Sequence, residues 1–139
     1  MQSRILIIED HLPSRELMAY LLVASGHEVV QAKNGRAGLE AAKAGAFDAI
    51  VCDVLLPDVG GEELVRKLRS NSGQTHPPLI AVTIISDGER ILAAGFDGFI
   101  PKPIEPRTFA RQIREFTRAR FSQAPPLSPI GPHARKAQE

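Results

Sequence analysis

The stretch FDAIVCDVLLPDVGG, residues 47–61, decides the fold of this chain. A run of apolar residues suited to a buried strand ends at a carboxylate, Asp53, and the chain then turns at Pro57, Asp58 and paired glycines. Burying a carboxylate costs free energy unless the charge has a partner. The acid at the end of this strand therefore indicates a chemical task, and the rest of the sequence shows which groups accompany it.

Four other short runs rich in β-branched residues flank this stretch, at 5–8, 28–30, 79–83 and 98–100. Helix-like segments separate the five runs, and such alternation predicts a parallel sheet covered on both faces. The apolar runs ILII and LIAVT suit strands that are buried on both sides. We therefore expect an α/β, doubly wound, five-stranded parallel sheet. The order 2-1-3-4-5 would make the first, third, fourth and fifth strands neighbours.

The segments between the strands carry helix signals. Gly26 supplies a left-handed stop for the first helix, and Asn34 is suited to cap the second, which ends near Gly45. A short fourth helix fits residues 87–94 and is closed by Gly95. The apolar residues at helical spacing are Leu17, Leu21 and Ala24; Leu39 and Ala42; Leu64, Val65 and Leu68; and Phe109, Ile113 and Phe116, the last three forming a core-facing stripe.

The length of 139 residues predicts one domain with a single core, here residues 1–121. Residues 122–139 contain four prolines and little periodicity, so we expect a flexible Pro-rich tail there.

The net charge of +1 gives no field that would attract nucleic acid or an anionic membrane. A single cysteine, Cys52, excludes an internal disulfide framework. The first apolar run has only four residues before two acids, which fits neither a signal peptide nor a membrane span. We expect a cytoplasmic protein.

Polar residues follow four of the five predicted strands. Glu9 and Asp10 end the first, Asp53 the third and Thr83 the fourth, and the fifth runs into Lys102. Ligands of open parallel sheets collect beyond the carboxyl ends of the strands, so these side chains are expected to share one crevice. Three carboxylates repel one another unless cations lie between them.

Lys102 supplies one positive charge, and a divalent ion would balance the remainder. Oxygen ligands without histidine or cysteine favour Mg²⁺ or a similar hard ion. A phosphoryl donor polarised by such an ion beside Asp53 would permit an aspartyl-phosphate intermediate. Lys102 and the hydroxyl of Thr83 are suited to bind the new phosphoryl oxygens.

Four motifs in this order carry a family resemblance: IIED, CDVLLPDVGG, AVT and GFDGFIPKPI. Over roughly residues 4–120 the chain resembles the receiver domain of bacterial two-component response regulators, of the single-domain type. The resemblance implies a flavodoxin-like fold and a phosphoryl group taken from a sensor histidine kinase or a phosphotransfer protein. It implies a signalling switch rather than a turnover enzyme, hydrolysing only its own phosphoryl group, as a monomer or a phosphorylation-dependent dimer.

By position, the resemblance implies that Asp53 is the phosphoacceptor. Glu9, Asp10 and Asp53 match the metal-binding acids, with Asp10 the more direct ligand and Glu9 acting through water. Leu55 would lend its backbone carbonyl to the same ion.

The resemblance also assigns a conformational switch. Thr83 matches the switch hydroxyl, Lys102 the lysine that pairs with the phosphate, and Phe99 the aromatic that changes rotamer when Thr83 moves. The bond between Lys102 and Pro103 matches one that is often cis. Downstream protein targets would bind the surface of the fourth helix, fifth strand and fifth helix.

Two departures from the family pattern follow Thr83. The next residue is usually small, but here it is Ile84, which could restrict access to the acceptor. The segment to Lys102 is about three residues shorter than usual, within the loop that normally moves when Thr83 is recruited. We therefore expect a short or displaced fourth helix, with signalling through the fifth helix or another surface.

Each assignment has a plainer structural alternative. Asp10 and Asp53 could be caps, Glu9 a solvated strand end, Thr83 an ordinary strand residue and Lys102 a surface lysine. The remaining candidates are interpreted structurally: Cys52 as a small core residue on the opposite face, His11 as solvated, and Asp58 as a loop or cap residue. Arg107, Arg111, Arg114 and Arg118 form either the wet face of the fifth helix or a basic docking surface.

Two other functions compete with the switch. One is a receiver-like adaptor that binds a partner without phosphorylation because Ile84 blocks the site. The other is a Mg²⁺-dependent phosphatase with an aspartyl nucleophile. That class usually has a second Asp two residues past the nucleophile, and this position is Leu55, which disfavours it.

Overall fold

A computed structural model of the chain describes residues 3–71 and 76–122. Its elements, in chain order, are β1 (Arg4–Ile8), α1 (Leu12–Ala24), β2 (Glu28–Ala32), α2 (Gly35–Ala44), β3 (Ala49–Cys52), α3 (Gly61–Asn71), β4 (Leu79–Thr83), α4 (Gly88–Ala93), β5 (Gly98–Pro101) and α5 (Phe109–Ser122). Apart from Ser122, the predicted tail lies outside the described residues.

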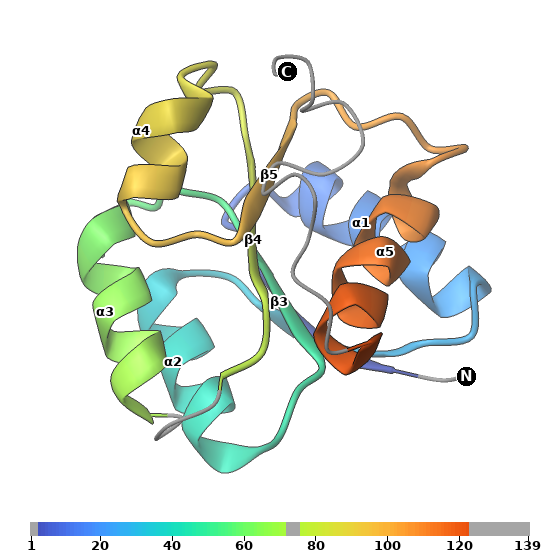
Figure 1. Cartoon of the computed structure of the whole chain (residues 1–139), viewed down its shortest axis with the longest axis horizontal. Coiled ribbons are helices and arrows are strands. Elements are labelled where there is room, and N and C mark those ends of the chain that lie inside the picture. The colour runs from blue at the N-terminus through green and yellow to red at the C-terminus, as the bar shows by residue number, and fades with distance from the viewer. Residues whose placement is uncertain (1–2, 72–75, 123–139) are drawn as a thin grey trace.

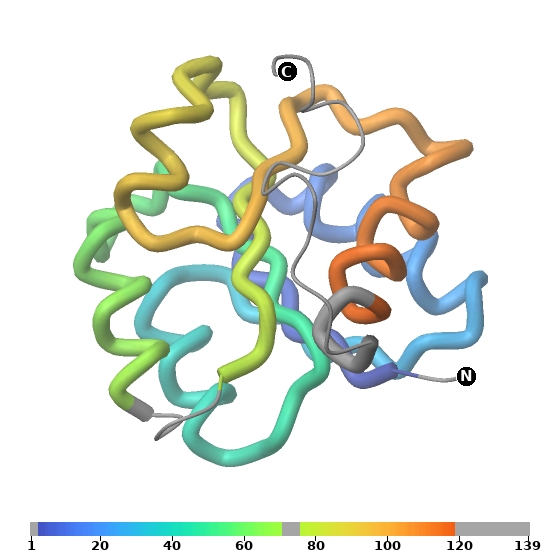
Figure 2. Tube along the Cα trace, in the orientation of Figure 1, coloured from blue at the N-terminus to red at the C-terminus, as the bar shows by residue number. Residues whose placement is uncertain are grey.

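The five strands form one sheet in the order β2-β1-β3-β4-β5, and every neighbouring pair is parallel. This confirms the predicted strand order. Figure 1 shows α2, α3 and α4 on one face of the sheet and α1 with α5 on the other. The trace in Figure 2 shows α1 and α5, the first and last helices, running beside each other.

Each face of the sheet has its own apolar core, because side chains alternate along a strand. In β1, Ile5 and Ile7 pack towards α1 and α5, whereas Leu6 and Ile8 pack towards the other three helices. The predicted helix residues Leu64, Val65, Leu68, Phe109 and Ile113 are all buried. All of β4 is buried too, which is why its sequence, LIAVT, shows no alternation.

β3 begins at Ala49, two residues later than the start predicted from the apolar run. A carboxylate oxygen of Asp48 accepts a hydrogen bond from the backbone N–H of Arg4 at 2.8 Å. The guanidinium of Arg4 lies over the ring of Phe47, 4.6 Å from its centroid. Both residues therefore secure the start of β1 instead of extending β3.

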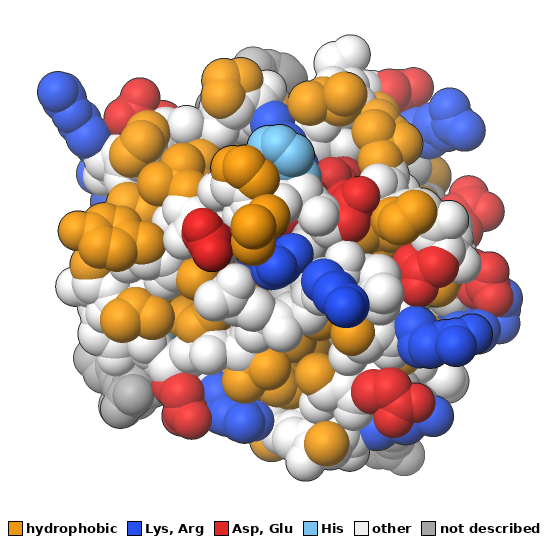
Figure 3. Space-filling model, turned by 180° about the vertical axis from the view of Figure 1, so that it is seen from behind, with side chains coloured by type: hydrophobic (Ala, Val, Ile, Leu, Met, Phe, Trp, Pro, Cys, Tyr) orange, Lys and Arg blue, Asp and Glu red, His pale blue; other side chains and the backbone are white. Residues whose placement is uncertain are grey.

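The outer face of α1 is apolar, like its core face. The predicted apolar residues Leu17, Leu21 and Ala24 therefore did not show which face of the helix is buried. Met18 and Leu22 pack into the core, whereas Leu17 is 40%, Val23 56% and Tyr20 69% exposed. A helix that is apolar on most sides has no single stripe that marks its buried face. Viewed from behind in Figure 3, apolar side chains gather on the left, where α1 lies.

α4 has only six residues, which confirms the predicted short fourth helix. The Asp87 side chain caps its first turn by accepting a hydrogen bond from the Arg90 N–H at 3.1 Å. Gly95 follows the helix with φ 115°, a left-handed conformation that favours glycine. Within the described residues, no helix is both long and apolar enough to cross a membrane.

Candidate functional site

Three carboxylates meet at the carboxyl edge of the sheet, as predicted. One oxygen from each of Glu9, Asp10 and Asp53 lies within 4.8 Å of the others. The parallel register places Ile8 of β1 opposite Cys52 of β3, so the residues that follow them are also neighbours. Glu9 and Asp53 are buried, whereas Asp10 is exposed. The group is therefore anchored on its inner side and open on its outer side.

Lys102 reaches this group from the far side of β4. Its Nζ lies 2.8 Å from Glu9 Oε1 and 3.1 Å from Asp53 Oδ2. Its backbone N–H donates to the Thr83 carbonyl at 2.9 Å, and the following bond to Pro103 is cis. Burial alone would lower the pKa of Lys102, but its contacts with Glu9 and Asp53 together raise it. The ammonium is therefore charged and shared by two acids.

The donor atoms fit a hard divalent cation. The Oε1 of Glu9 is buried without a hydrogen bond and meets only the ion-pair contact with Lys102. Asp53 Oδ1 accepts from the backbone N–H of Leu55 at 3.0 Å, which orients the carboxylate. Leu55 also pairs with Gly60 in an isolated antiparallel bridge that shapes the loop. Carboxylate and carbonyl oxygens with an open, solvated side are what Mg²⁺ prefers.

The backbone of Glu9 is held by a residue that the sequence analysis did not single out. A guanidinium nitrogen of Arg15, on α1, donates to the Glu9 carbonyl at 2.9 Å. The backbone N–H of His11 donates to Glu9 Oε2 at 3.1 Å, and the His11 ring caps α1 through Ser14. Only the fold brings Arg15 back to the end of β1, so no local motif could have revealed this contact.

Thr83 and Ile84 stand at the end of β4. Thr83 is fully buried, and its hydroxyl oxygen accepts a hydrogen bond from the Ile85 N–H at 3.3 Å. The side chain of Ile84 is 70% exposed. Phe99 lies on β5 opposite Ala81, and its half-buried ring borders the α2–α3–α4 core.

One acid and one thiol near the acceptor, Asp58 and Cys52, have the structural roles that the sequence predicted for them. The carboxylate of Asp58 accepts from the N–H groups of Arg36 and Gly35, both at 2.9 Å, and these bonds lower its pKa. Cys52 is buried on the face opposite Asp53. Burial, then the charges of Asp53 and Glu9, raise the pKa of the Cys52 thiol, which keeps it protonated.

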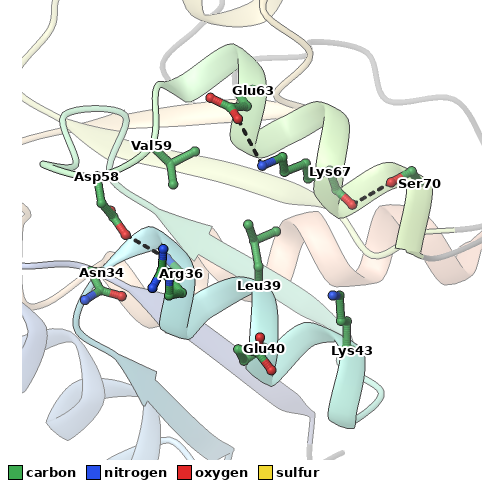
Figure 4. Close-up of a pocket in the computed structure, with 10 residues that line it drawn as sticks. All are labelled: Asn34, Arg36, Leu39, Glu40, Lys43, Asp58, Val59, Glu63, Lys67 and Ser70. Carbon is green, nitrogen blue, oxygen red and sulfur yellow. Dashed lines mark hydrogen bonds and ion pairs between the residues drawn. The ribbon is translucent and has the colours of Figure 1, made fainter.

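A separate groove of about 600 Å³ lies between α2 and α3 (Figure 4). The Lys67 ammonium on its wall pairs with Glu63 at 2.9 Å. Its charged side chains balance: Arg36, Lys43 and Lys67 against Glu40, Asp58 and Glu63. This balance selects no sign of ligand charge, and the groove shares no residue with the carboxylate group.

The site and fold match known proteins. Residues 5–114 match the family described as the response regulator receiver domain. The polar-differentiation response regulator DivK of Brucella anthropi is 34% identical over 119 residues, which cover 84% of this chain and 97% of that protein.

Two solved structures share the fold along most of their length. Chemotaxis response regulator CheY4 of Vibrio cholerae superposes with a TM-score of 0.77 at 28% identity, covering 84% of this chain and 99% of that one. The receiver domain of a Pseudomonas aeruginosa PAO1 sensor histidine kinase, solved with a magnesium ion in its active site cleft, gives 0.76 at 25% identity, covering 85% and 99%. With the family match spanning every element from β1 into α5, this chain belongs to the response regulator receiver domain family.

Proposed function

We propose that this chain is a phosphorylation switch in which Asp53 accepts a phosphoryl group from a phosphohistidine on a sensor kinase or phosphotransfer protein. The observation that carries the proposal is the position of Lys102, whose Nζ touches both Glu9 and Asp53 beside the exposed carboxylate of Asp10. The raised pKa of Lys102 keeps its ammonium charged beside the proposed acceptor, as phosphate binding requires.

The chain's own residues orient the reaction. A carboxylate oxygen of Asp53 attacks phosphorus, an O–P bond forms, the N–P bond breaks, and its electron pair stays on the imidazole nitrogen. The N–H of Leu55 and the ammonium of Lys102 each hold one oxygen of Asp53, so the carboxylate is aimed before the donor arrives. Lys102 and the Thr83 hydroxyl then donate to the transferred phosphoryl oxygens.

Magnesium is the cofactor that we propose for this step. Asp10, Asp53 and the Leu55 carbonyl would hold it, with Glu9 acting through water. When bound, the ion neutralises charge on the phosphoryl oxygens. The ammonium of Lys102, which contacts both Glu9 and Asp53, would balance the remaining carboxylate charge.

The exposed apolar residues suggest where the phosphodonor docks. The outer face of α1, formed by Leu12, Leu17, Tyr20 and Val23, begins directly after Asp10 and His11 at the mouth of the site. Leu55 and Ile84, 49% and 70% exposed, belong to the loops around the same mouth. We propose that an apolar helical face of the phosphohistidine protein covers α1 and thereby presents its histidine to Asp53.

The output partner is proposed to bind the surface formed by α4, β5 and α5. Arg107, Arg111, Arg114 and Arg118 are all exposed there, on or just before α5. Because the Asp53 carboxylate is already charged, the phosphoryl group changes the local charge by about one unit, and movement of Thr83 and Phe99 would carry that change to β5.

The test is modification of Asp53 in the presence of Mg²⁺ and phosphoramidate, followed by intact-mass measurement. The wild-type chain should gain one phosphoryl group, and Asp53→Asn should gain none. Asp58→Asn is the matched control, because this acid lies five residues further on and bonds only to α2. Absence of modification in the wild type would reject the switch, and repeated turnover of phosphate esters would favour a phosphatase.

The alternative function is a receiver-like adaptor that binds its partner without phosphorylation, because the branched side chain of Ile84, next to Thr83, blocks the acceptor. This function predicts that wild-type and Asp53→Asn proteins bind the partner equally well. It also predicts that Ile84→Ala alone restores modification by phosphoramidate.

A further inference from the structure

The guanidinium of Arg15, near the start of α1, bonds to the ends of two strands. Its Nη1 donates to the Glu9 carbonyl, just after β1, at 2.9 Å, and its Nε donates to the side-chain oxygen of Gln31, on β2, at 3.3 Å. Both acceptors are neutral oxygens, so neither contact is an ion pair. Because the guanidinium is planar and its donors point in fixed directions, the contact with Gln31 orients the donor that Glu9 receives.

The contact with Glu9 continues the hydrogen bonding of β1 beyond the last residue of β2. The Glu9 N–H donates to the carbonyl of Ala32 at 3.0 Å, and β2 ends at that residue. The Glu9 carbonyl accepts from the side chain of Arg15 instead of from a strand. Because Glu9 is buried, this carbonyl needs a partner, and Arg15 supplies one where the sheet has ended.

Asp10 lies between two backbone groups that are held by hydrogen bonds. The Glu9 carbonyl belongs to the planar peptide that joins Glu9 to Asp10, so Arg15 fixes the orientation of that peptide. On the other side of Asp10, the His11 N–H donates to Glu9 Oε2 at 3.1 Å. The side chain of Asp10 is exposed, but the backbone that carries it is fixed at both ends.

The position of Asp10 matters because Mg²⁺ tolerates little error in its ligands. The ion takes oxygen ligands in near-octahedral geometry at about 2.0–2.1 Å. Glu9, Asp10 and Asp53 bring one oxygen each within 4.8 Å of the others. Glu9 and Asp53 are buried in the protein, so Asp10 is the ligand whose position depends most on its backbone.

We propose that Arg15 is a positioning residue of the metal site: it holds the Glu9 carbonyl and so keeps the Asp10 carboxylate within reach of the ion. Gln31 contributes by orienting the guanidinium. The inference rests on the proposed function and adds to its metal site a residue that touches neither the ion nor the phosphoryl group. The role runs against the charge of Arg15, because a cation near the acids repels Mg²⁺. Positioning and charge therefore predict opposite effects when Arg15 is replaced.

Replacing the guanidinium should weaken the binding of Mg²⁺. Arg15→Met keeps a long side chain on α1 and loses both hydrogen bonds. Loss of a group that orients a metal ligand typically lowers metal affinity about 10- to 100-fold, and loss of a repelling positive charge offsets part of that effect. We expect the affinity to fall roughly three- to tenfold. If Arg15 acted through its charge alone, the affinity would rise.

The experiment is titration of the isotopically labelled full chain with MgCl₂ at constant ionic strength, followed by the backbone amide resonances of Asp10 and Asp53. Lys33→Met is the matched control, because Lys33 is an exposed cation that directly follows β2 at the same edge of the sheet. Its affinity for Mg²⁺ should be unchanged or slightly higher. Urea denaturation without Mg²⁺ measures the stability of each variant. A contact that only stabilises the fold would lower the free energy of unfolding in Arg15→Met and would not weaken Mg²⁺ binding.

Gln31→Leu tests the contact without changing a charge. Leucine removes the acceptor for Nε and leaves the positive charge of Arg15 in place. We expect a smaller loss of Mg²⁺ affinity than in Arg15→Met. The double variant should bind Mg²⁺ no more weakly than Arg15→Met alone, because both substitutions act through one guanidinium.

A second measurement needs no metal. The Nε–H group of Arg15 should give a separate resonance, identified by its loss in Arg15→Met. Gln31→Leu should shift this resonance because the hydrogen bond to Nε is lost, and Lys33→Met should not.

The outcomes separate the inference from the function on which it rests. Equal or tighter binding of Mg²⁺ by Arg15→Met, additive losses in the double variant, or an unshifted Nε–H resonance in Gln31→Leu overturns the inference and leaves the proposed function standing. If Arg15→Met does not fold, Gln31→Leu decides: weaker binding supports the positioning role, and unchanged binding overturns it. Failure of the wild type to bind Mg²⁺ rejects the proposed metal site, and the inference falls with it.

Discussion

Lys102 lies nearer to Glu9 than to the proposed acceptor Asp53, with Nζ–oxygen distances of 2.8 and 3.1 Å. The side chain of Glu9 is fully buried, whereas that of Asp53 is 8% exposed. Glu9, the more deeply buried acid, therefore anchors the Lys102 ammonium, and Asp53, the more accessible acid, makes the longer contact with it. A phosphoryl group on Asp53 can draw the ammonium towards itself while Glu9 continues to anchor it.

Removing Lys102 should destabilise the protein in the absence of divalent ions. Lys102→Met leaves two neighbouring buried carboxylates without their cation, and we expect a loss of roughly 2–4 kcal/mol in the free energy of unfolding. Added Mg²⁺ should restore part of this loss by replacing the positive charge. Urea denaturation with and without Mg²⁺ measures both effects.

Lys67→Met is the control for that substitution, because Lys67 pairs with Glu63 between half-exposed side chains on α3. Its stability should be close to that of the wild type and insensitive to Mg²⁺. A Lys102→Met protein as stable as the wild type would contradict the shared-cation arrangement.

The stability of the protein should depend on pH through His27. Burial, then the charges of Arg114 and the amino terminus, lower the pKa of His27, and Asp48 opposes them. The backbone N–H of Ser3 donates to Nδ1, so the neutral ring carries its proton on the buried Nε2.

Because the pKa is lowered on folding, the unfolded chain binds a proton at His27 that the folded protein does not. The free energy of unfolding should therefore fall as the pH drops below about 6.5, and level off below the folded pKa. Denaturation at several pH values should show a weaker acid dependence for His27→Asn, which keeps an acceptor for Ser3. Equal acid dependence in both proteins would be inconsistent with a neutral, buried His27.

Trimming Ile84 should speed chemistry at Asp53 in both directions. Ile84→Ala removes an exposed branched side chain next to Thr83, and we expect phosphorylation by phosphoramidate and hydrolysis of the product each to rise two- to tenfold, or about 0.4–1.4 kcal/mol in activation free energy. Time-resolved intact mass follows both rates. The control Leu17→Ala, which trims an exposed apolar residue on α1, should change neither rate. Unchanged rates in Ile84→Ala would show that the side chain of Ile84 does not limit access to Asp53.

A negative charge on the outer face of α1 should slow phosphorylation by a phosphohistidine protein but not by phosphoramidate. In Tyr20→Glu we expect kcat/KM for any phosphohistidine domain that phosphorylates the wild type to fall about tenfold or more, as for loss of an aromatic anchor. Phosphorylation by phosphoramidate should stay the same. Arg118→Glu, at an exposed position on α5, tests for a general charge effect. If both variants lose donor activity equally, docking is not confined to α1.

The strands and the acids at their ends were predictable from local signals, whereas the strand order followed from the fold that the family resemblance implies. Apolar runs mark the strands, and parallel strands bring their carboxyl ends to one edge, so Glu9, Asp53 and Lys102 had to converge. The cap of α2 by Asn34 and the stop at Gly26 were equally local, and the structure has both.

Contacts between distant segments were not predictable in the same way. Nothing near Gly88 in the sequence shows that a ring from β5 lies against it. Even the nearer contact of Arg15 with the Glu9 carbonyl, six residues apart, depends on the angle at which α1 leaves the end of β1. The buried face of α1 was also ambiguous, since its outer residues are as apolar as its inner ones, and only packing against β1 and α5 decides between them.

Asp58 makes the surroundings of the acceptor asymmetric. It fastens the loop after β3 to α2 through two short bonds, and Val59 packs where a side chain at Gly35 would stand. On the other side, the loop after β4 is joined to Thr83 by a single 3.3 Å bond. Amide hydrogen exchange should therefore be slow at Gly35 and Arg36 and unchanged by phosphorylation, but altered at Ile85. The loop after β3 is therefore fixed to α2, whereas the loop after β4 is free to move. We expect phosphorylation to displace the loop after β4 and to leave the loop after β3 in place.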